Sequence, residues 1–278
     1  MLKKSFSILT FMALAVALMG CGGAEAATVA VPKANPQIVL RISGAGNTSI
    51  ILRAVKPQFE AATPGYRLEV LPGSGTSGGV QGALQGVLDA AAMSRPPKAD
   101  ETARSLKYKE FGNAGVAVFT HLDVDITSLT AAQFGAIFMG EVSNWAEVGG
   151  PNLPIIRYVR DDRESATRIL RQSILGDTPF PVRSVQVLTG ADAMLTAVEG
   201  TPGSVGFGLW PGAVAKNAQV HPIALNNILP TDPAYPLVTP LGIGYRSDHQ
   251  AKVQPLLEWL SSERGQAALR GFAVIARP

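Results

Sequence analysis

The hydrophobic pattern near the start of the chain predicts a buried strand followed by an amphipathic helix. Residues 38–43 are apolar and β-branched, which favours a strand inside a parallel sheet. A segment rich in glycine and hydroxyl side chains, residues 44–49, follows directly. The apolar positions after it recur at helical spacing: Ile51, Val55, Phe59 and Ala62. Thr-Pro-Gly at residues 63–65 is expected to end the helix.

The same order of elements is repeated between residues 66 and 88. Residues 66–71 predict a second strand, and residues 72–79 form a second loop of Pro, Gly, Ser and Thr. The helix after this loop is expected to have one apolar face: Val80, Leu84, Val87 and Leu88. Alternating strands and helices indicate an α/β fold with a parallel sheet. Ligands of such sheets bind at the carboxyl ends of the strands, where these loops gather.

The rest of the chain continues this alternation. Further elements are expected as follows: strands at 115–120, 154–160 and 237–245, and helices at 130–140, 165–176, 256–260 and 262–269. Thr130 and Gln133 match a capping box, and Ser165 is expected to cap the helix that it begins. Residues 201–240 contain seven prolines and little periodicity, so we expect irregular structure there.

Composition and charge narrow the class of protein. The chain has 278 residues, of which 46% are hydrophobic and 16% charged, and its net charge is +3. This composition predicts a folded core and excludes bulk disorder. Lys3 and Lys4 are the only charged residues among the first 20, and no two basic residues are adjacent after them. A nucleic-acid binder needs clustered basic residues, so this class is excluded.

The N-terminus resembles a bacterial lipoprotein signal peptide. Lys3 and Lys4 precede an apolar run of 11 residues, 8–18, and Leu-Met-Gly leads into Cys21. This run is too short to span a bilayer, for which about 20 residues are needed. We therefore expect residues 1–20 to be removed and Cys21 to be lipidated, with residues 21–36 as a tether; plain secretory cleavage near residues 24–27 is the alternative. The expected location is periplasmic or cell-surface, with the protein anchored to the membrane through this lipid alone.

The chain has one cysteine and three histidines, and they predict no reactive centre. With Cys21 lipidated, disulfides, four-cysteine zinc sites and thiol nucleophiles are excluded. His121, His221 and His249 lack the spacing of metal ligands. The chain has no nucleophile elbow and no P-loop, and Gly44-Ala-Gly46 lacks the third glycine of a dinucleotide fingerprint. We expect no metal, no cofactor and no catalysis.

Three expected helices begin with hydroxyl-rich segments. These segments are Asn47-Thr48-Ser49, Thr76-Ser77-Gly78-Gly79 and Ser165-Ala166-Thr167. A helix N-terminus offers free backbone N–H groups and a partial positive charge, and each hydroxyl can donate or accept. Arg160 precedes the third segment, and its planar guanidinium suits a tetrahedral oxyanion. Ordinary helix capping, and for Arg160 an ion pair with Asp161 or Asp162, are the alternatives.

Several segments resemble the substrate-binding proteins of phosphate ABC transporters. The resemblance is carried by residues 129–145, by Gly149-Gly150 and Arg160 after them, and by later landmarks at 201–207, 235–237 and 262–266. It covers about residues 38–276 and implies the type II periplasmic-binding-protein fold, an α/β architecture of two domains joined by two crossover strands. By this analogy, domain one is 37–116 plus 242–278 and domain two is 117–241.

The resemblance also implies which residues bind the ligand. Positions that match the family's contacts, together with the hydroxyl-rich helix starts, give this set: Thr48, Ser49, Thr76, Ser77, Ser94, Arg160, Ser165, Ala166 and Thr167. Arg160 lies five residues before Ser165, where four is commoner in the family, so Arg163 is an alternative partner for the anion. Ser94 occupies the place of an aspartate that accepts the proton of hydrogen phosphate, which predicts weaker rejection of sulfate. Asp161, Asp162 or Glu164 could restore such an acceptor.

The resemblance and the residues together predict a binding protein. We expect an exported, monomeric lipoprotein, not an enzyme, that captures inorganic phosphate or a similar oxyanion in an interdomain cleft and delivers it to an ABC permease of the inner membrane. Binding of another small anion, or a cell-surface sensory or adhesive role of the same fold, are the alternatives. A secreted phosphatase is disfavoured because it would need a metal cluster or a nucleophile and base.

Overall fold

A computed structural model describes residues 37–162, 164–181 and 185–276. The expected signal peptide, the lipidation site Cys21, the tether and Arg163 lie outside these residues. Within the described part of the chain, no helix is long and apolar enough to cross a bilayer.

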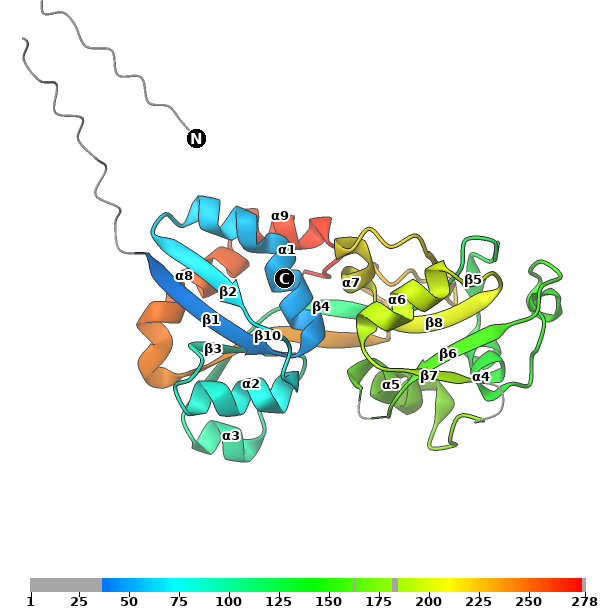
Figure 1. The fold of residues 1–278 in the computed structure, drawn as a ribbon, viewed down its shortest axis with the longest axis horizontal. Helices are drawn as coiled ribbons and strands as arrows, with labels where there is room; N and C mark the ends of the chain where they lie inside the picture. Colours follow the sequence, from blue (N-terminus) through cyan, green and yellow to red (C-terminus); the bar gives the residue numbers. More distant parts are fainter. Residues whose placement is uncertain (1–36, 163, 182–184, 277–278) are drawn as a thin grey trace, which may run out of the picture. The chain divides into compact units, whose positions relative to one another are not determined.

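The first part of the fold alternates strands and helices, as the sequence predicts. Its elements are β1 (Ile38–Gly44), α1 (Gly46–Ala62), β2 (Tyr66–Val70), α2 (Gly75–Leu84), β3 (Ala90–Met93) and α3 (Ala99–Ala103). β1 pairs in parallel with both β2 and β3, so the loops that follow β1 and β3 leave the same edge of the sheet. Two of the hydroxyl-rich segments, residues 47–49 and 76–79, lie in the first turns of α1 and α2, which follow β1 and β2 (Figure 1).

The remaining strands extend this sheet, and further helices connect them. The strands are β4 (Leu106–Thr120), β5 (Ser128–Leu129), β6 (Ile156–Arg160), β7 (Gln186–Leu188), β8 (Ser204–Leu209), β9 (His221–Leu225) and β10 (Val238–Arg246). The helices are α4 (Ala131–Met139), α5 (Ser165–Leu170), α6 (Ala191–Glu199), α7 (Trp210–Ala215), α8 (Gln250–Ser261) and α9 (Glu263–Gly271). Short 3-10 helices lie at Trp145–Val148 and Ser247–His249, and a π-helical turn lies at Arg171–Leu175.

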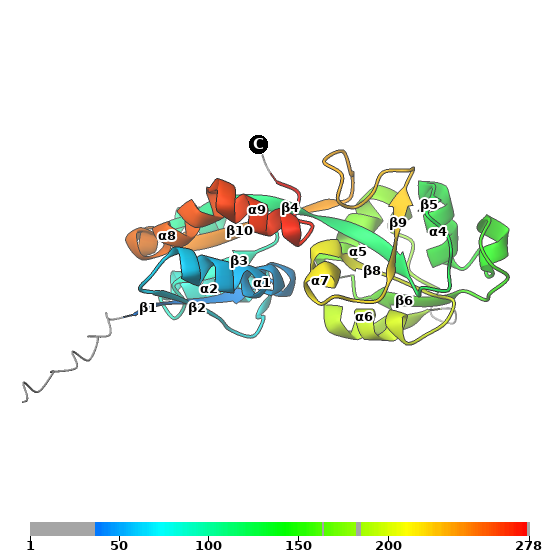
Figure 2. The same cartoon turned by 90° about the horizontal axis from the view of Figure 1, so that it is seen from above.

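The long strand β4 connects two parts of the sheet, whose order is β2-β1-β3-β10-β4-β8-β6-β7. The first part of β4, Leu106 to Gly115, pairs antiparallel with β10, which itself pairs antiparallel with β3. The last part, Val116 to Thr120, pairs antiparallel with β8, and β8 pairs in parallel with β6. β4 and β10 are seen side by side in both views of the ribbon (Figure 2).

Helices cover both faces of the sheet. Since alternate residues of a strand point to opposite faces, one strand can pack against helices on both sides. Along β3, Ala90 and Ala92 pack in one core cluster with residues of α1, whereas Ala91 and Met93 pack in another with residues of α2. In the last part of β4, Val116 and Val118 pack in a cluster with residues of α4, whereas Ala117 and Phe119 pack in a cluster with residues of α6 and α7. Strands buried on both faces read as continuous apolar runs, as β1 does.

Three expectations about local structure are wrong. Residues 201–240 are not irregular, since they contain β8, α7 and β9. α2 ends at Leu84, and Val87 beyond it is 68% exposed instead of lying on the apolar helix face. Ser165 is the first residue of α5 instead of its cap, because Glu164 holds the cap position. The capping box of Thr130 and Gln133 is confirmed.

Candidate functional site

The ends of β1 and β3 bring two of the hydroxyl-rich helix starts together. The Thr48 hydroxyl donates to the carbonyl of Met93 at 3.0 Å and lies 2.9 Å from the Ser94 hydroxyl. The Ser94 amide donates to the Thr76 hydroxyl at 3.3 Å. On the other side, the Thr239 hydroxyl donates to the Ser94 carbonyl at 3.0 Å. Ser94 is therefore held by three elements, α1, α2 and β10, at the centre of this hydroxyl cluster.

Two glycines allow the backbones at this edge to approach closely. A Cβ atom on Gly79, in α2, would lie 2.6 Å from both the Gly44 Cα and the Ser43 carbonyl oxygen. Gly44 has a φ of +148°, and a Cβ there would lie 2.1 Å from the Ala92 carbonyl oxygen. Side chains of any size would push these segments apart. The glycines thus set the distance between the loops that carry Thr48, Thr76 and Ser94.

Arg160 is a buried cation at the end of β6. Its side chain is 4% exposed, and Nη2 donates to Glu164 Oε2 at 2.8 Å. Its Nε finds no hydrogen-bond partner within the described part of the chain. Glu164 is thus an ion-pair partner of Arg160, while Asp162, one of the two alternatives from the sequence, binds Arg171. A buried N–H without a partner is costly, so an acceptor placed beside this Nε would stabilise it.

The third helix start lies beside the first. The side-chain amide of Asn47, in α1, is 3.5 Å from the Ser165 hydroxyl at the start of α5. The Thr167 hydroxyl donates to the carbonyl of Arg160 at 3.3 Å, which connects α5 to the end of β6. The segments that contain Thr48, Ser165 and Arg160 therefore meet, although more than 100 residues separate the first two.

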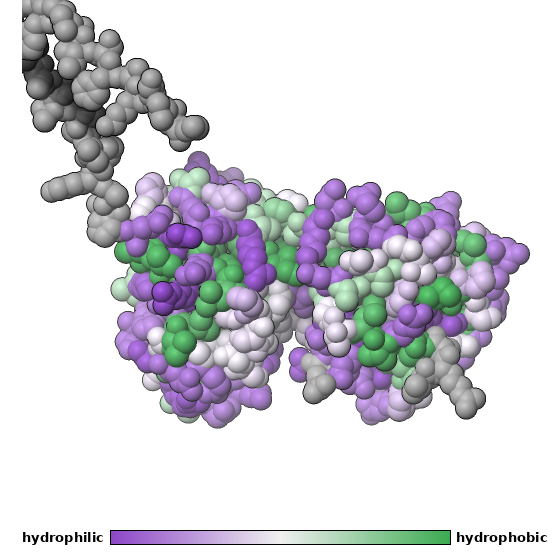
Figure 3. Space-filling view, in the orientation of Figure 1, coloured by the Kyte–Doolittle hydropathy of each residue, from purple (hydrophilic) through white to green (hydrophobic). Residues whose placement is uncertain are grey.

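Two adjoining pockets lie where these segments meet. The first, of about 370 Å³, is lined by polar residues from two stretches of the chain, 47–98 and 164–168: Asn47, Ser74, Thr76, Ser77, Ser94, Arg95, Lys98, Glu164, Ser165 and Arg168. The second, of about 430 Å³, contains Arg160 and shares Gly46, Asn47, Gly75 and Glu164 with the first. The molecular surface is hollowed between α2 and α5 (Figure 3).

The predicted ligand residues divide into two groups. Thr76, Ser77, Ser94, Ser165 and Arg160 line these pockets. The other four, Thr48, Ser49, Ala166 and Thr167, are fully buried and line neither pocket. These four residues of α1 and α5 therefore lie behind the pocket lining. Their contact with a ligand stays a prediction.

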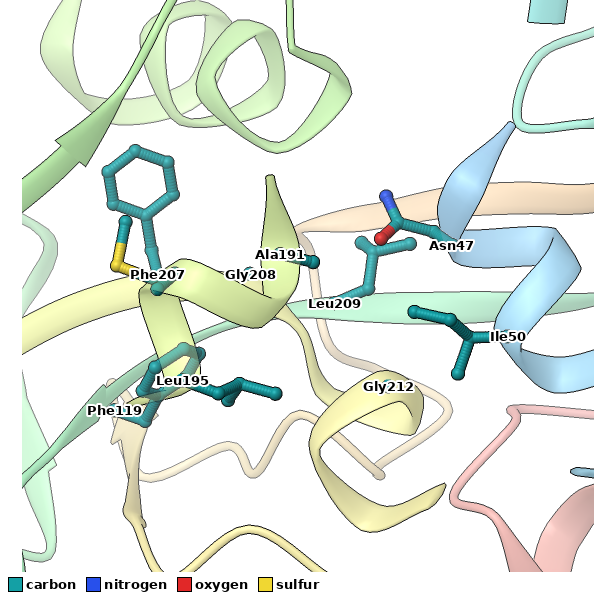
Figure 4. Close-up of a pocket in the computed structure, with 10 residues that line it drawn as sticks. Asn47, Ile50, Phe119, Ala191, Leu195, Phe207, Gly208, Leu209 and Gly212 are labelled. Atoms are coloured by element: carbon teal, nitrogen blue, oxygen red, sulfur yellow. The ribbon is translucent and has the colours of Figure 1, made fainter. Parts of the chain in front are cut away.

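A small apolar cavity lies on the other side of Asn47. Ile50 of α1 faces Leu209 and Gly212 across it (Figure 4). Its volume is about 10 Å³, which is room for one water molecule at most. This cavity is too small for a solute, so the polar pockets are the candidate binding site.

Several pocket residues were missed by sequence reasoning. Arg95, Lys98 and Arg168 add cationic side chains to the first pocket, whereas Glu164, which adds a carboxylate, was one of the acceptors that the sequence suggested. Arg95 directly follows Ser94, which was the one available signal. Among the described residues, no group of His, Cys, Asp and Glu side chains is arranged to hold a metal ion. The arrangement offers guanidinium, hydroxyl and amide donors, which suit an oxyanion.

Comparison with known proteins identifies relatives of this fold. Residues 30–264 match the family model of the PBP superfamily domain. The phosphate-binding protein PstS of Borreliella burgdorferi is 23% identical over 167 residues, which cover 56% of this chain and 59% of that relative. The match therefore spans about three fifths of the length of the curated relative.

Two solved structures share the fold over most of the chain. A putative phosphate ABC transporter substrate-binding protein with bound phosphate from Clostridium perfringens has a TM-score of 0.72 and 21% identity, covering 86% of this chain and 100% of that chain. An ABC-type phosphate transport receptor from Vibrio cholerae has a TM-score of 0.60 and 25% identity, with the same coverage of both chains.

Proposed function

The chain belongs to the PBP superfamily domain family and has the type II periplasmic-binding-protein fold, and from this premise we propose that it is an exported receptor for inorganic phosphate or a closely similar oxyanion. It delivers the ion to an ABC permease. Like the binding proteins and receptors to which it is similar, it is a binding protein and not an enzyme.

Arg160 is the observation that carries this proposal. Its guanidinium is buried, and its Nε lacks a partner among the described residues. Arg160 lines the second pocket, which adjoins the first pocket with the hydroxyls of Thr76, Ser94 and Ser165. Charge-assisted hydrogen bonds from arginine to an oxyanion are short and strong. An anion in this pocket would supply the acceptor that Nε lacks.

The proposed binding mode is closure of two domains over the ion. Domain one comprises residues 37–116 and 242–278, domain two comprises residues 117–241, and the cleft lies between them. β4 and β10 are the proposed crossover strands, and β4 changes its partner from β10 to β8 at residue 116. The hydroxyls of α1 and α2 then belong to domain one, and Arg160 and Ser165 to domain two. We propose that the receptor works as a monomer.

Inorganic phosphate is expected to stabilise the protein against heat. At a hundredfold excess over Kd, a ligand that binds only the folded state adds about 2.7 kcal/mol to the free energy of unfolding. For a protein of this size the melting temperature should rise by roughly 5–10 °C. Thermal unfolding and isothermal titration with phosphate, arsenate, sulfate and molybdate measure this effect. A melting temperature and heat signal unmoved by millimolar phosphate would refute phosphate as the ligand.

We propose that the receptor is periplasmic or cell-surface and is held to the membrane by a lipid on Cys21. Changing Cys21→Ser removes the thiol that carries the lipid, so the protein should leave the membrane fraction or stay uncleaved. Fractionation followed by mass measurement of the N-terminus distinguishes these results. Membrane attachment of a correctly processed Cys21→Ser protein would contradict the anchor.

A further inference from the structure

A second arginine of the pocket is fixed in place by a buried carboxylate. Arg95 Nη1 and Nη2 donate to Glu101 Oε2 and Oε1 at 2.8 and 2.7 Å, which is the paired geometry that a guanidinium and a carboxylate favour. The Glu101 side chain is 4% exposed, and its Oε2 also accepts from the Lys98 amide at 2.7 Å. Glu101 therefore sets both the position and the plane of the Arg95 guanidinium.

The pair stays ionised at every pH at which the protein is expected to work. The hydrogen bonds from Arg95 outweigh the cost of burial and lower the pKa of the Glu101 carboxyl to about 2. The same contact raises the pKa of Arg95. A buried carboxylate is costly unless it is paired and hydrogen-bonded, and here both conditions are met.

Helix capping explains Glu101 but leaves part of Arg95 unexplained. Glu101 lies in the first turn of α3 and accepts from the backbone amide of Lys98, and this contact needs no arginine. Of the five N–H groups of Arg95, two donate to Glu101 and one donates to the Pro96 carbonyl. A fourth, on Nη2, donates at 3.5 Å to the hydroxyl of Ser77, which lines the first pocket with Arg95 and Ser94.

We propose that Arg95 is a second guanidinium ligand of the bound oxyanion, held ready by Glu101. This inference rests on the proposed function and deepens it. Arg160 supplies one guanidinium from the end of β6, and Arg95 supplies the other from the segment after β3. Their two pockets adjoin at Asn47 and Glu164, and the proposal places the anion where the pockets meet.

Two guanidinium groups favour tetrahedral anions with two negative charges. The attraction grows with the charge of the anion, whereas hydroxyl and amide donors distinguish charge less strongly. Phosphate gains its second charge as the pH rises through neutrality. The contribution of Arg95 to phosphate affinity should therefore be larger at pH 8 than at pH 6.

Isothermal titration with inorganic phosphate at pH 6 and pH 8 tests the proposal with Arg95→Met. We expect a loss of affinity of about tenfold or more at pH 8, as for removal of a hydrogen bond to a charged group, and a smaller loss at pH 6. Arg104→Met is the matched control, because Arg104 follows α3 and donates to Gln81 without lining either pocket. It removes the same charge and should bind as the wild type does.

A second variant keeps the result interpretable if Arg95→Met fails to fold. The double variant Arg95→Gln with Glu101→Gln leaves no unpaired buried charge, and its melting temperature should stay close to that of the wild type. It should still lose affinity, and more at pH 8 than at pH 6, but less than Arg95→Met, which also leaves the Glu101 carboxylate without its cation. Wild-type affinity in either folded variant, or an equal loss at both pH values, would overturn the role of Arg95. A wild-type protein that binds no phosphate would instead refute the proposed function itself.

Discussion

Arg160→Met should reduce the affinity for phosphate by about a hundredfold or more. A hydrogen bond to a charged group contributes roughly 1.5–3 kcal/mol, and each 1.4 kcal/mol is about tenfold in affinity. The side chain is 4% exposed and its Nε has no partner among the described residues, so we expect more than one such bond to the ion. The change also leaves the Glu164 carboxylate at the pocket without its cation, which repels the anion. Isothermal titration at neutral pH measures the loss.

Two further variants separate the causes of this loss. Arg41→Met removes a charge from the surface of β1, where Arg41 pairs with Glu69, and should leave affinity unchanged. Arg160→Met combined with Glu164→Gln removes the uncompensated carboxylate. If Arg160 binds the ion, this double variant stays far weaker than the wild type. Full recovery would show that Arg160 serves only to neutralise Glu164, and wild-type affinity in Arg160→Met would remove Arg160 from the site.

The elements that the sequence predicts well are those with local signals. The strand and helix of residues 38–62 combine a β-branched run with one apolar helix face. α4 begins at a capping box, and Gly140, in the left-handed conformation, caps its C-terminus. The prediction of irregular structure for residues 201–240 was wrong because the local signals for strands and helices there are weak. All six residues of β8 are buried, but two of them are glycines, which weakens the strand pattern. Pro211 suggests a break, yet proline is favoured in the first turn of a helix, where α7 has it.

The site was predictable only as far as the backbone determines it. Helix starts after parallel strands gather at one edge of the sheet, so the loops of Thr48 and Thr76 were expected to meet. Which residues line the pocket depends on side-chain contacts between distant segments, such as that of Asn47 with Ser165. The pairing of Arg95 with Glu101 lies within one short segment, but only the turn into α3 brings these two groups together.

Ser94→Asp should increase the preference for phosphate over sulfate by about tenfold or more. Near neutral pH, hydrogen phosphate carries a proton that a carboxylate accepts, whereas sulfate has no proton to offer and its oxygen is repelled. In the wild type, the Ser94 hydroxyl lies at the centre of the hydroxyl cluster, 2.9 Å from the Thr48 hydroxyl, and carries no charge that would repel sulfate. We therefore expect sulfate to compete measurably with phosphate for the wild-type protein. Competition titrations of both proteins give the two affinity ratios.

Ser94→Asn is the matched control, because asparagine has the shape of aspartate without its charge. It should bind phosphate and sulfate with a ratio close to that of the wild type, so that a gain confined to aspartate is due to the negative acceptor. A wild-type protein that ignores about a thousandfold excess of sulfate while it binds phosphate tightly would contradict the assignment. Another acceptor would then be at work, and Glu164, whose carboxylate binds Arg160 and which lines both pockets, is the one to test. In that case Glu164→Gln, not Ser94→Asp, should change the ratio of the two affinities.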